Sequence, residues 1–132
     1  MMRPSSRSSL LQSLCIVFFT VLSPLAASAD TEVPGGTISS DTTWTLAGSP
    51  YTVVSNLDIH GTDGPDGVTT LTIEPGVVVR TGGSCSISVG FGGPGALVAD
   101  GDAGGTPLPI RFTSAGTSPA PGDWRGIRFG NQ

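Results

Sequence analysis

The chain reads LTIEPGVVVR from Leu71 to Arg80, and this segment predicts two short β-strands joined by a tight turn. Apolar residues at odd positions alternate with threonine in its first half, which is the period-two pattern of a strand with one buried face. Pro75 presets φ and Gly76 supplies a positive φ, the combination that a type II turn requires. We therefore expect four side chains to point inward: Leu71, Ile73, Val77 and Val79.

Similar short runs continue on both sides of this segment, separated by Gly, Pro and Asp. Helices are not expected, because the longest stretch after Asp30 without Gly or Pro, Thr37 to Ala47, is rich in Thr and Ser. Strands this short do not hold a free sheet together, so they must stack in a repeating structure. The predicted strands contain these segments: Thr43–Leu46, Val53–Ile59, Ile87–Val89, Leu97–Ala99, Ile110–Phe112 and Ile127–Phe129.

Three further segments follow LTIEPGVVVR in order: GALVAD at 95–100, PIRFTS at 109–114 and DWRGIRF at 123–129. Together with Trp44 and Tyr51 ahead of them, they resemble the opening coils of secreted right-handed parallel β-helix repeat proteins, which are similar in fold to pectin lyases. The resemblance implies an all-β fold. It also implies that the chain forms the N-terminal cap and first coils of a right-handed parallel β-helix, a solenoid.

The first 29 residues have the pattern of a secretory signal peptide. Arg3 and Arg7 precede a short apolar run, and Ala27-Ser28-Ala29 supplies small residues at a cleavage site before Asp30. The apolar run is shorter than the ~20 residues that cross a bilayer, so no membrane span is expected after signal removal. The expected location is therefore secreted: the extracellular space or the cell surface, with the periplasm as an alternative.

The expected domain organisation has three parts: a signal peptide (1–29), a leader or linker (30–42) and the start of a β-helix domain (43–132). Each coil of a solenoid buries one face against the next, so a last strand near Phe129 leaves an open edge. We accordingly expect the chain to be an N-terminal fragment of a longer β-helix. A disordered Gly/Pro-rich secreted segment is the competing structural hypothesis.

Charge narrows the classes of partner. The part after residue 29 has ten acidic residues, four arginines and no lysine, a net charge of −6. It lacks the basic surface that nucleic acid binding requires, so nucleic acid is not an expected partner. A polysaccharide or a cell-surface ligand is the expected partner class, and the oligomeric state is left open.

No catalytic set is recognisable in the sequence. His60 is the only histidine, so it cannot build a familiar triad or a zinc site with a second histidine. Cys85 is the only thiol after the signal peptide in this sequence, and it is either a small buried core residue or the partner of a cysteine on a downstream segment that this sequence does not contain.

Calcium is the only cofactor for which the sequence offers candidate ligands. Four aspartates lie in Gly-rich loops that could supply hard oxygen ligands, although Asp-Gly is also ordinary turn chemistry and neither loop completes a known calcium repeat. The candidate ligands are Asp63, Asp66, Asp100 and Asp102.

The leading functional hypothesis is a non-enzymatic structural or adhesive module. The alternative is the N-terminal non-catalytic part of a polysaccharide lyase or glycoside hydrolase with a pectin lyase-like fold. Lyases of that fold use arginine as a base, which directs attention to Arg80, Arg111, Arg125 and Arg128. Arg111 and Arg128 follow inward-facing residues and are expected to point outward, and Trp124 is either a packing residue or a surface for sugar stacking.

Overall fold

A computed structural model gives the fold of residues 30–130, and the regular structure in this range is almost entirely β-strand. Sheet A contains β1 (Thr31–Val33), β4 (Tyr51–Val53), β7 (Val78–Thr81) and β10 (Arg111–Ser114). Sheet B contains β2 (Gly36–Ile38), β5 (Leu57–Ile59), β8 (Ile87–Val89) and β11 (Ile127–Phe129). Sheet C contains β3 (Thr42–Trp44), β6 (Thr69–Ile73) and β9 (Gly95–Ala99). One short 3-10 turn, η1 (Leu46–Gly48), follows β3. The predicted signal peptide lies outside the described residues.

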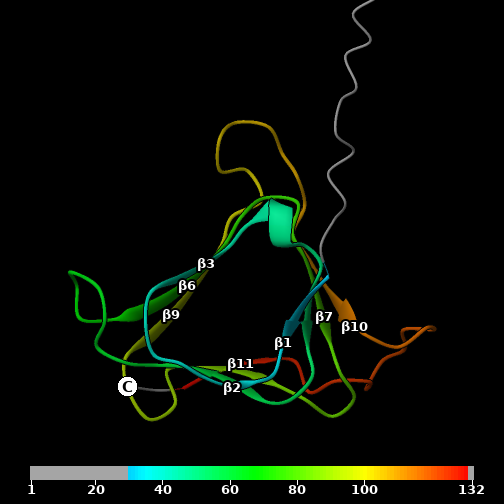
Figure 1. Ribbon diagram of the computed structural model, residues 1–132, viewed down its shortest axis with the longest axis horizontal. Coiled ribbons are helices and arrows are strands. Elements are labelled where there is room, and N and C mark those ends of the chain that lie inside the picture. The colour runs from blue at the N-terminus through cyan, green and yellow to red at the C-terminus, as the bar shows by residue number, and fades with distance from the viewer. Residues whose placement is uncertain (1–29, 131–132) are drawn as a thin grey trace, which may run out of the picture.

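The chain passes through sheets A, B and C in that order and then repeats the path. We call one such passage a circuit: the strands form three full circuits, and β10 and β11 begin a fourth. The three sheets form the sides of a triangle around a central core (Figure 1). Every pairing between neighbouring strands is parallel. The expectation of an all-β fold is confirmed, and the three all-parallel sheets are compatible with a parallel β-helix.

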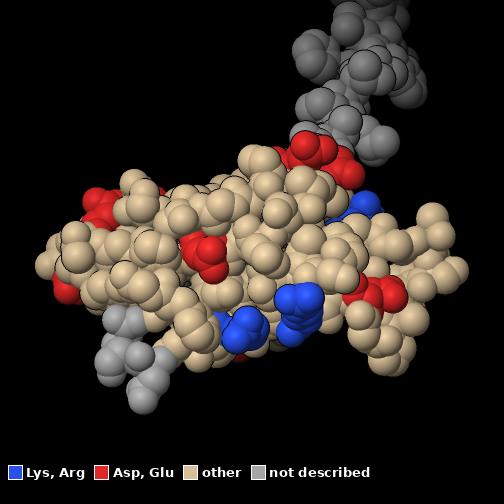
Figure 2. Space-filling view, turned by 90° about the horizontal axis from the view of Figure 1, so that it is seen from below, with Lys and Arg blue, Asp and Glu red and all other residues tan. Residues whose placement is uncertain are grey.

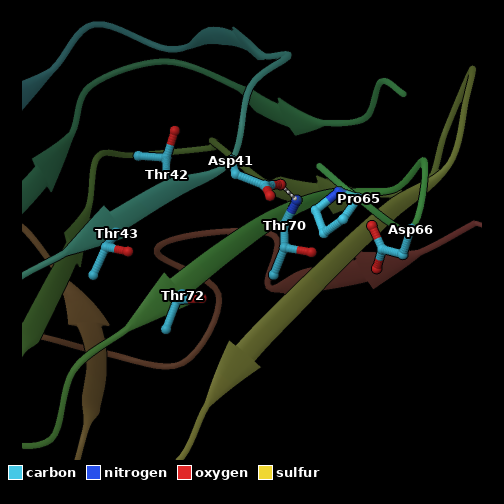
Figure 3. A pocket seen from close by; sticks show the side chains of 7 residues that line it. All are labelled: Asp41, Thr42, Thr43, Pro65, Asp66, Thr70 and Thr72. Carbon is cyan, nitrogen blue, oxygen red and sulfur yellow. Dashed lines mark hydrogen bonds between the residues drawn. The ribbon is translucent and has the colours of Figure 1, made fainter. Parts of the chain in front are cut away.

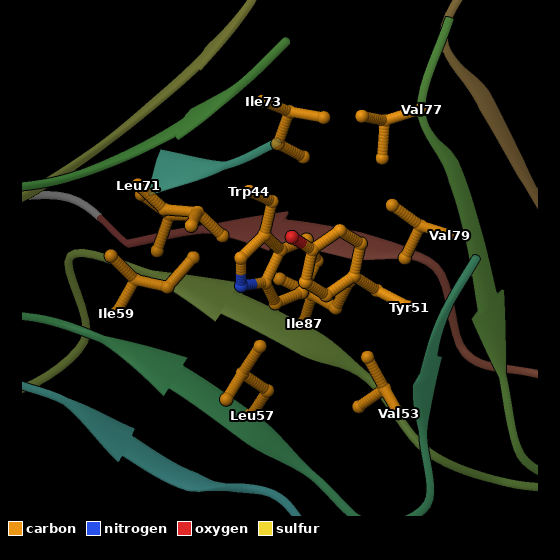
Figure 4. Packing of buried hydrophobic residues seen from close by; sticks show 11 residues of the cluster. Trp44, Tyr51, Val53, Leu57, Ile59, Leu71, Ile73, Val77, Val79 and Ile87 are labelled. Carbon is orange, nitrogen blue, oxygen red and sulfur yellow. The ribbon is translucent and has the colours of Figure 1, made fainter. Parts of the chain in front are cut away.

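Inward-facing residues stack on equivalent residues of the next circuit. On sheet B, for example, Leu57 pairs with Ile87 and Ile59 pairs with Val89. The resulting column of side chains fills the triangle (Figure 4). Burial of this apolar surface is the main stabilising contribution available to strands of three to five residues. The buried cluster consists of Trp44, Tyr51, Val53, Leu57, Ile59, Leu71, Ile73, Val77, Val79, Ile87 and Val89.

Trp44 and Tyr51 stack face to face inside this core, with ring centroids 4.7 Å apart and an interplanar angle of 7°. Trp44 closes the first circuit on β3, and Tyr51 opens the second on β4. The Tyr51 hydroxyl accepts a hydrogen bond from the backbone N–H of Thr45 at 2.9 Å, so the polar tip of this buried ring has a partner. The two aromatic residues thereby join consecutive circuits.

The turn between β6 and β7 has the geometry expected from its sequence. Gly76 has φ +81°, and the N–H of Val77 bonds to the carbonyl of Glu74 at 3.3 Å, as in a type II turn. Leu71, Ile73, Val77 and Val79 are all buried, as predicted. Residues 30–42, expected as a leader, contain β1 and β2, which pair with β4 and β5. Within the described residues, strand structure therefore begins at Thr31.

The last circuit differs from expectation at one residue. Phe129, predicted to point inward, pairs with Val89 in the inward-facing column but is 67% exposed. Within residues 30–130 no strand lies on the outer side of β11, so nothing covers the ring. Ile110, Phe112 and Ile127 are partly buried against the core for the same reason. Arg111 and Arg128 are exposed, in agreement with the predicted alternation.

Candidate functional site

A groove of about 530 Å³ lies on the outer face of sheet A, and we call it the sheet A groove. Its floor is formed by outward-facing residues of β7 and β10, two neighbouring strands. Its wall is the loop that follows β10. The lining residues are Val78, Arg80, Arg111, Thr113, Ser114, Ala115, Gly116, Thr117 and Pro119.

The two arginines of the groove are diagonal neighbours on the sheet. Arg80 pairs with Thr113, and Arg111 pairs with Val78, two positions earlier on each strand. Neighbouring strands are about 4.8 Å apart and two residues advance about 6.6 Å along a strand, which places the two Cβ atoms about 8 Å apart. Two long guanidinium side chains on one face at this spacing can contact the same ligand.

The Arg80 guanidinium is paired with a carboxylate of the same chain, that of Asp30. Its Nη1 lies 3.8 Å from Oδ2 of Asp30, and the side chains are 46% and 59% exposed. Thr52, between them on β4, donates its hydroxyl to Oδ1 of Asp30 at 2.9 Å. An exposed ion pair of this length contributes little to stability. Within residues 30–130 Arg111 makes no ion pair.

The wall of the groove is held by Asp123. Its Oδ2 accepts a hydrogen bond from the N–H of Ala120 at 2.8 Å. Ser114, which is buried at the end of β10, accepts from the N–H of Gly116 at 2.9 Å. The hydrogen bond from Ala120, followed by one from the Ser114 side chain, lowers the pKa of the Asp123 carboxyl below its ordinary value of 3.8. The backbone of Asp123 also accepts from the N–H of Ser84 at 2.9 Å, which ties the loop to the preceding circuit.

A second hollow of about 410 Å³ lies on the outer face of sheet C (Figure 3). Its two carboxylates already accept hydrogen bonds from the backbone. Asp41 accepts from the N–H of Thr70 at 2.8 Å, which joins the turn before β3 to β6. Asp66 accepts from the N–H of Val68 at 3.1 Å. The remaining lining residues are Thr42, Thr43, Pro65 and Thr72.

The four candidate calcium ligands fall into two separate pairs. Asp63 and Asp66 precede β6, whereas Asp100 and Asp102 follow β9. Because β6 and β9 run parallel in register, the two pairs lie at opposite ends of sheet C, about 17 Å apart for five extended residues.

Three of these four carboxylates accept hydrogen bonds from backbone N–H groups. Two of these bonds each lie within a single loop, and the third joins two neighbouring loops. Asp63 accepts from Asp41 at 2.8 Å, Asp66 from Val68 and Asp100 from Asp102 at 2.9 Å. Among the described residues, no group of three or more His, Cys, Asp or Glu side chains is placed to hold a metal ion. Turn formation accounts for Asp66 and Asp100, and a contact between two loops accounts for Asp63. Calcium binding stays an untested prediction.

His60, Cys85 and Trp124 lie apart from the sheet A groove. His60 follows β5 and packs beside Gly92 and Gly93 in the loop of the next circuit. Cys85 is buried and unpaired within the described chain, with its Sγ 3.5 Å from the carbonyl oxygen of Gly83. Trp124 is half-buried in the segment that leads into β11.

Charge is distributed unevenly along the stack of circuits. The first circuit and the residue before it carry Asp30, Glu32 and Asp41 and no basic residue, whereas the fourth circuit carries three arginines, Arg111, Arg125 and Arg128, and one acidic residue, Asp123. In Figure 2, basic residues lie mainly toward the lower edge, whereas acidic residues are spread over the upper edge, the centre and both ends of the view. Although the net charge is negative, the last circuit therefore presents positive charge.

Comparison of the chain with protein-family models, curated proteins and solved structures finds no match. Among residues 30–130, no helix has the length and apolar character needed to span a membrane.

Proposed function

We propose that this chain forms the N-terminal cap and first coils of a right-handed parallel β-helix in a secreted or cell-surface protein, with a structural or adhesive function and no catalysis. The observation that carries the proposal is the repeated path through sheets A, B and C in one register. Crossover connections between parallel strands are right-handed in about 98% of cases, which supports the proposed hand. A stack of this kind presents long, stiff faces on which ligand contacts can be spaced regularly.

The chemistry of the outer faces supports adhesion to glycans. The outward positions of sheets A and C carry several hydroxyl groups, and the sheet A groove adds two guanidinium groups to them. Hydroxyls and guanidinium groups are the donors that recognise sugar hydroxyls and acidic substituents. The export signal predicted at residues 1–29 supports a position where such glycans are met.

Expression of the full chain with its own leader in a bacterial host tests both halves of the proposal. We expect the exported product to begin at Asp30, and an Ala27→Arg, Ala29→Arg double variant to remain uncleaved. The purified product should bind polysaccharides in a solid-phase panel without producing new reducing or unsaturated ends. Retention of the intact chain in the cytoplasm would contradict secretion, and cleavage of any bound polysaccharide would contradict a non-catalytic role.

A further inference from the structure

We propose that the sheet A groove binds an acidic glycan, a sugar chain bearing carboxylate or sulfate groups, through Arg80 and Arg111. The inference rests on the proposed adhesive function and names the ligand class of this surface. Its volume of about 530 Å³ lies within the range of ordinary ligand sites, ~300–1,000 Å³. It differs from the sheet C hollow, whose Asp41 and Asp66 carboxylates repel anions.

The contact with Asp30 shows that the Arg80 guanidinium can pair with a carboxylate on this face. The Asp30 carboxylate lies 3.8 Å from the guanidinium of Arg80 on the outer surface of sheet A. Because the pair is exposed and long, an external oxyanion can replace Asp30 at little cost in free energy. Arg111, which makes no ion pair within residues 30–130, offers a second guanidinium about 8 Å away on the next strand.

Hydroxyl groups complete the groove beside the two charges. Thr113 lies directly opposite Arg80 in the register, and Thr117 comes from the loop that forms the wall. These side chains can donate to or accept from sugar hydroxyls, which a simple inorganic anion lacks. The Asp123 hydrogen bonds fix the wall before any ligand arrives, so little ordering is needed on binding.

The position of the groove also fits an anionic ligand. The exported chain has a net charge of −6, and its positive charge is concentrated on the last circuit, which contributes β10 to the groove. Arg128, on sheet B, lies over the Phe91 ring at 5.4 Å and is outside the groove. It provides a control of equal charge change.

The test uses three probes with one backbone: dextran, carboxymethyl-dextran and dextran sulfate, titrated onto the secreted chain by calorimetry. We expect one or both charged polymers to bind and neutral dextran to bind weakly. Arg80→Gln and Arg111→Gln should each weaken binding about tenfold, whereas Arg128→Gln should stay within about twofold. Asp30→Asn should tighten binding about two- to fivefold, because it removes the internal competitor of Arg80. The charged polymer that binds more tightly shows whether the groove prefers carboxylate or sulfate groups.

Each other result overturns the inference. Equal losses in Arg128→Gln and Arg111→Gln would show general charge attraction with no specific groove. Binding of neutral dextran alone would contradict the assignment of an acidic glycan and would still agree with the proposed adhesive function. Absence of binding to all three polymers would remove the groove as a glycan site, and the export and polysaccharide-panel experiments would still decide the proposed function separately. Circular dichroism of each variant checks that the fold is retained.

Discussion

Asp123 illustrates how one partly buried side chain organises a loop in this molecule. Its carboxylate accepts the N–H of Ala120 and interacts with the Ser114 side chain, and its pKa is lowered by these two hydrogen bonds. The charged form is thus favoured in the folded protein over the unfolded chain. The contribution to stability is present above the ordinary pKa of 3.8 and is lost as the pH falls through the lowered folded value.

Acidification should therefore loosen the groove wall before the core unfolds. An NMR titration of the Asp123 carboxyl is expected to give a midpoint below 3.8, and the protection factor of the Ala120 amide, the factor by which it exchanges more slowly than an unstructured peptide at the same pH, should fall below that midpoint. Asp123→Ala should show the same low protection of the Ala120 amide at neutral pH, with the protection of the β5 amides unchanged. A midpoint at or above 3.8 would contradict the hydrogen-bonded arrangement.

At the scale of elements, the circuits pack so closely that some positions accept only glycine. Gly95 opens β9 beside the end of β5, and a Cβ at this position would collide with the backbone carbonyl of Ile59. Two residues earlier, Gly93 has ordinary van der Waals room, with His60 Nδ1 3.5 Å from a Cβ placed there. The spacing between circuits 2 and 3 thus depends on the absence of one side chain.

The two glycines make a matched pair of variants. Gly95→Ala should lower the free energy of unfolding by about 1–3 kcal/mol, because backbone must shift to make room. Gly93→Ala, which adds the same methyl group at ordinary van der Waals distance from its neighbours, should change it by less than about 0.5 kcal/mol. Urea unfolding followed by circular dichroism measures both. Equal stability of the two variants would show that β9 is not held against β5 as the structure describes.

The elements also show where the sequence was informative. Alternation identified the inward residues of β6 and β7, and Pro75-Gly76 identified their turn, because both signals are local. The sequence does not predict β1 and β2, because three residues on either side of Pro34-Gly35 are too few to show a period of two. Their strand conformation depends on pairing with β4 and β5 in the next circuit.

The same limit explains why the sheet A groove was not predicted. The sequence suggests Arg80 and Arg111 as separate candidates, but whether they lie side by side depends on the register between β7 and β10. That register cannot be counted from a period, because connections between circuits vary in length. Tyr51 pairs with Val79, a step of 28 positions, and Val79 with Phe112, a step of 33.

At the scale of the whole molecule, stability is shared between neighbouring circuits. Each circuit contacts only the ones directly before and after it, as in other stacked repeats. The middle circuits are covered on both sides, so Leu57, Leu71 and Val79 are almost fully buried. Among residues 30–130 the outer circuits are covered on one side, and their apolar residues such as Val33 and Phe112 are only partly buried.

Hydrogen exchange should therefore be graded along the stack. In exchange measured by mass spectrometry, peptides covering β5 and β8 should be the most protected, and those covering β1 and β11 the least. Protection in the middle of sheet B should exceed that at its edges by at least about tenfold, corresponding to ~1.4 kcal/mol of opening free energy. Uniform protection across all circuits would instead indicate a single cooperative unit.

Sheets A and B have four strands each in residues 30–130 and sheet C has three, so this end of the stack is a step and not a flat plane. The step resembles the ledge on a crystal that grows around a screw dislocation. A strand laid on β9 fills the ledge on sheet C but moves it to sheet A, and the next strand moves it to sheet B. Adding strands therefore never removes the ledge. Terminating such a spiral requires a segment of another shape, one that covers the ledge and the exposed Phe129 without presenting a strand edge of its own.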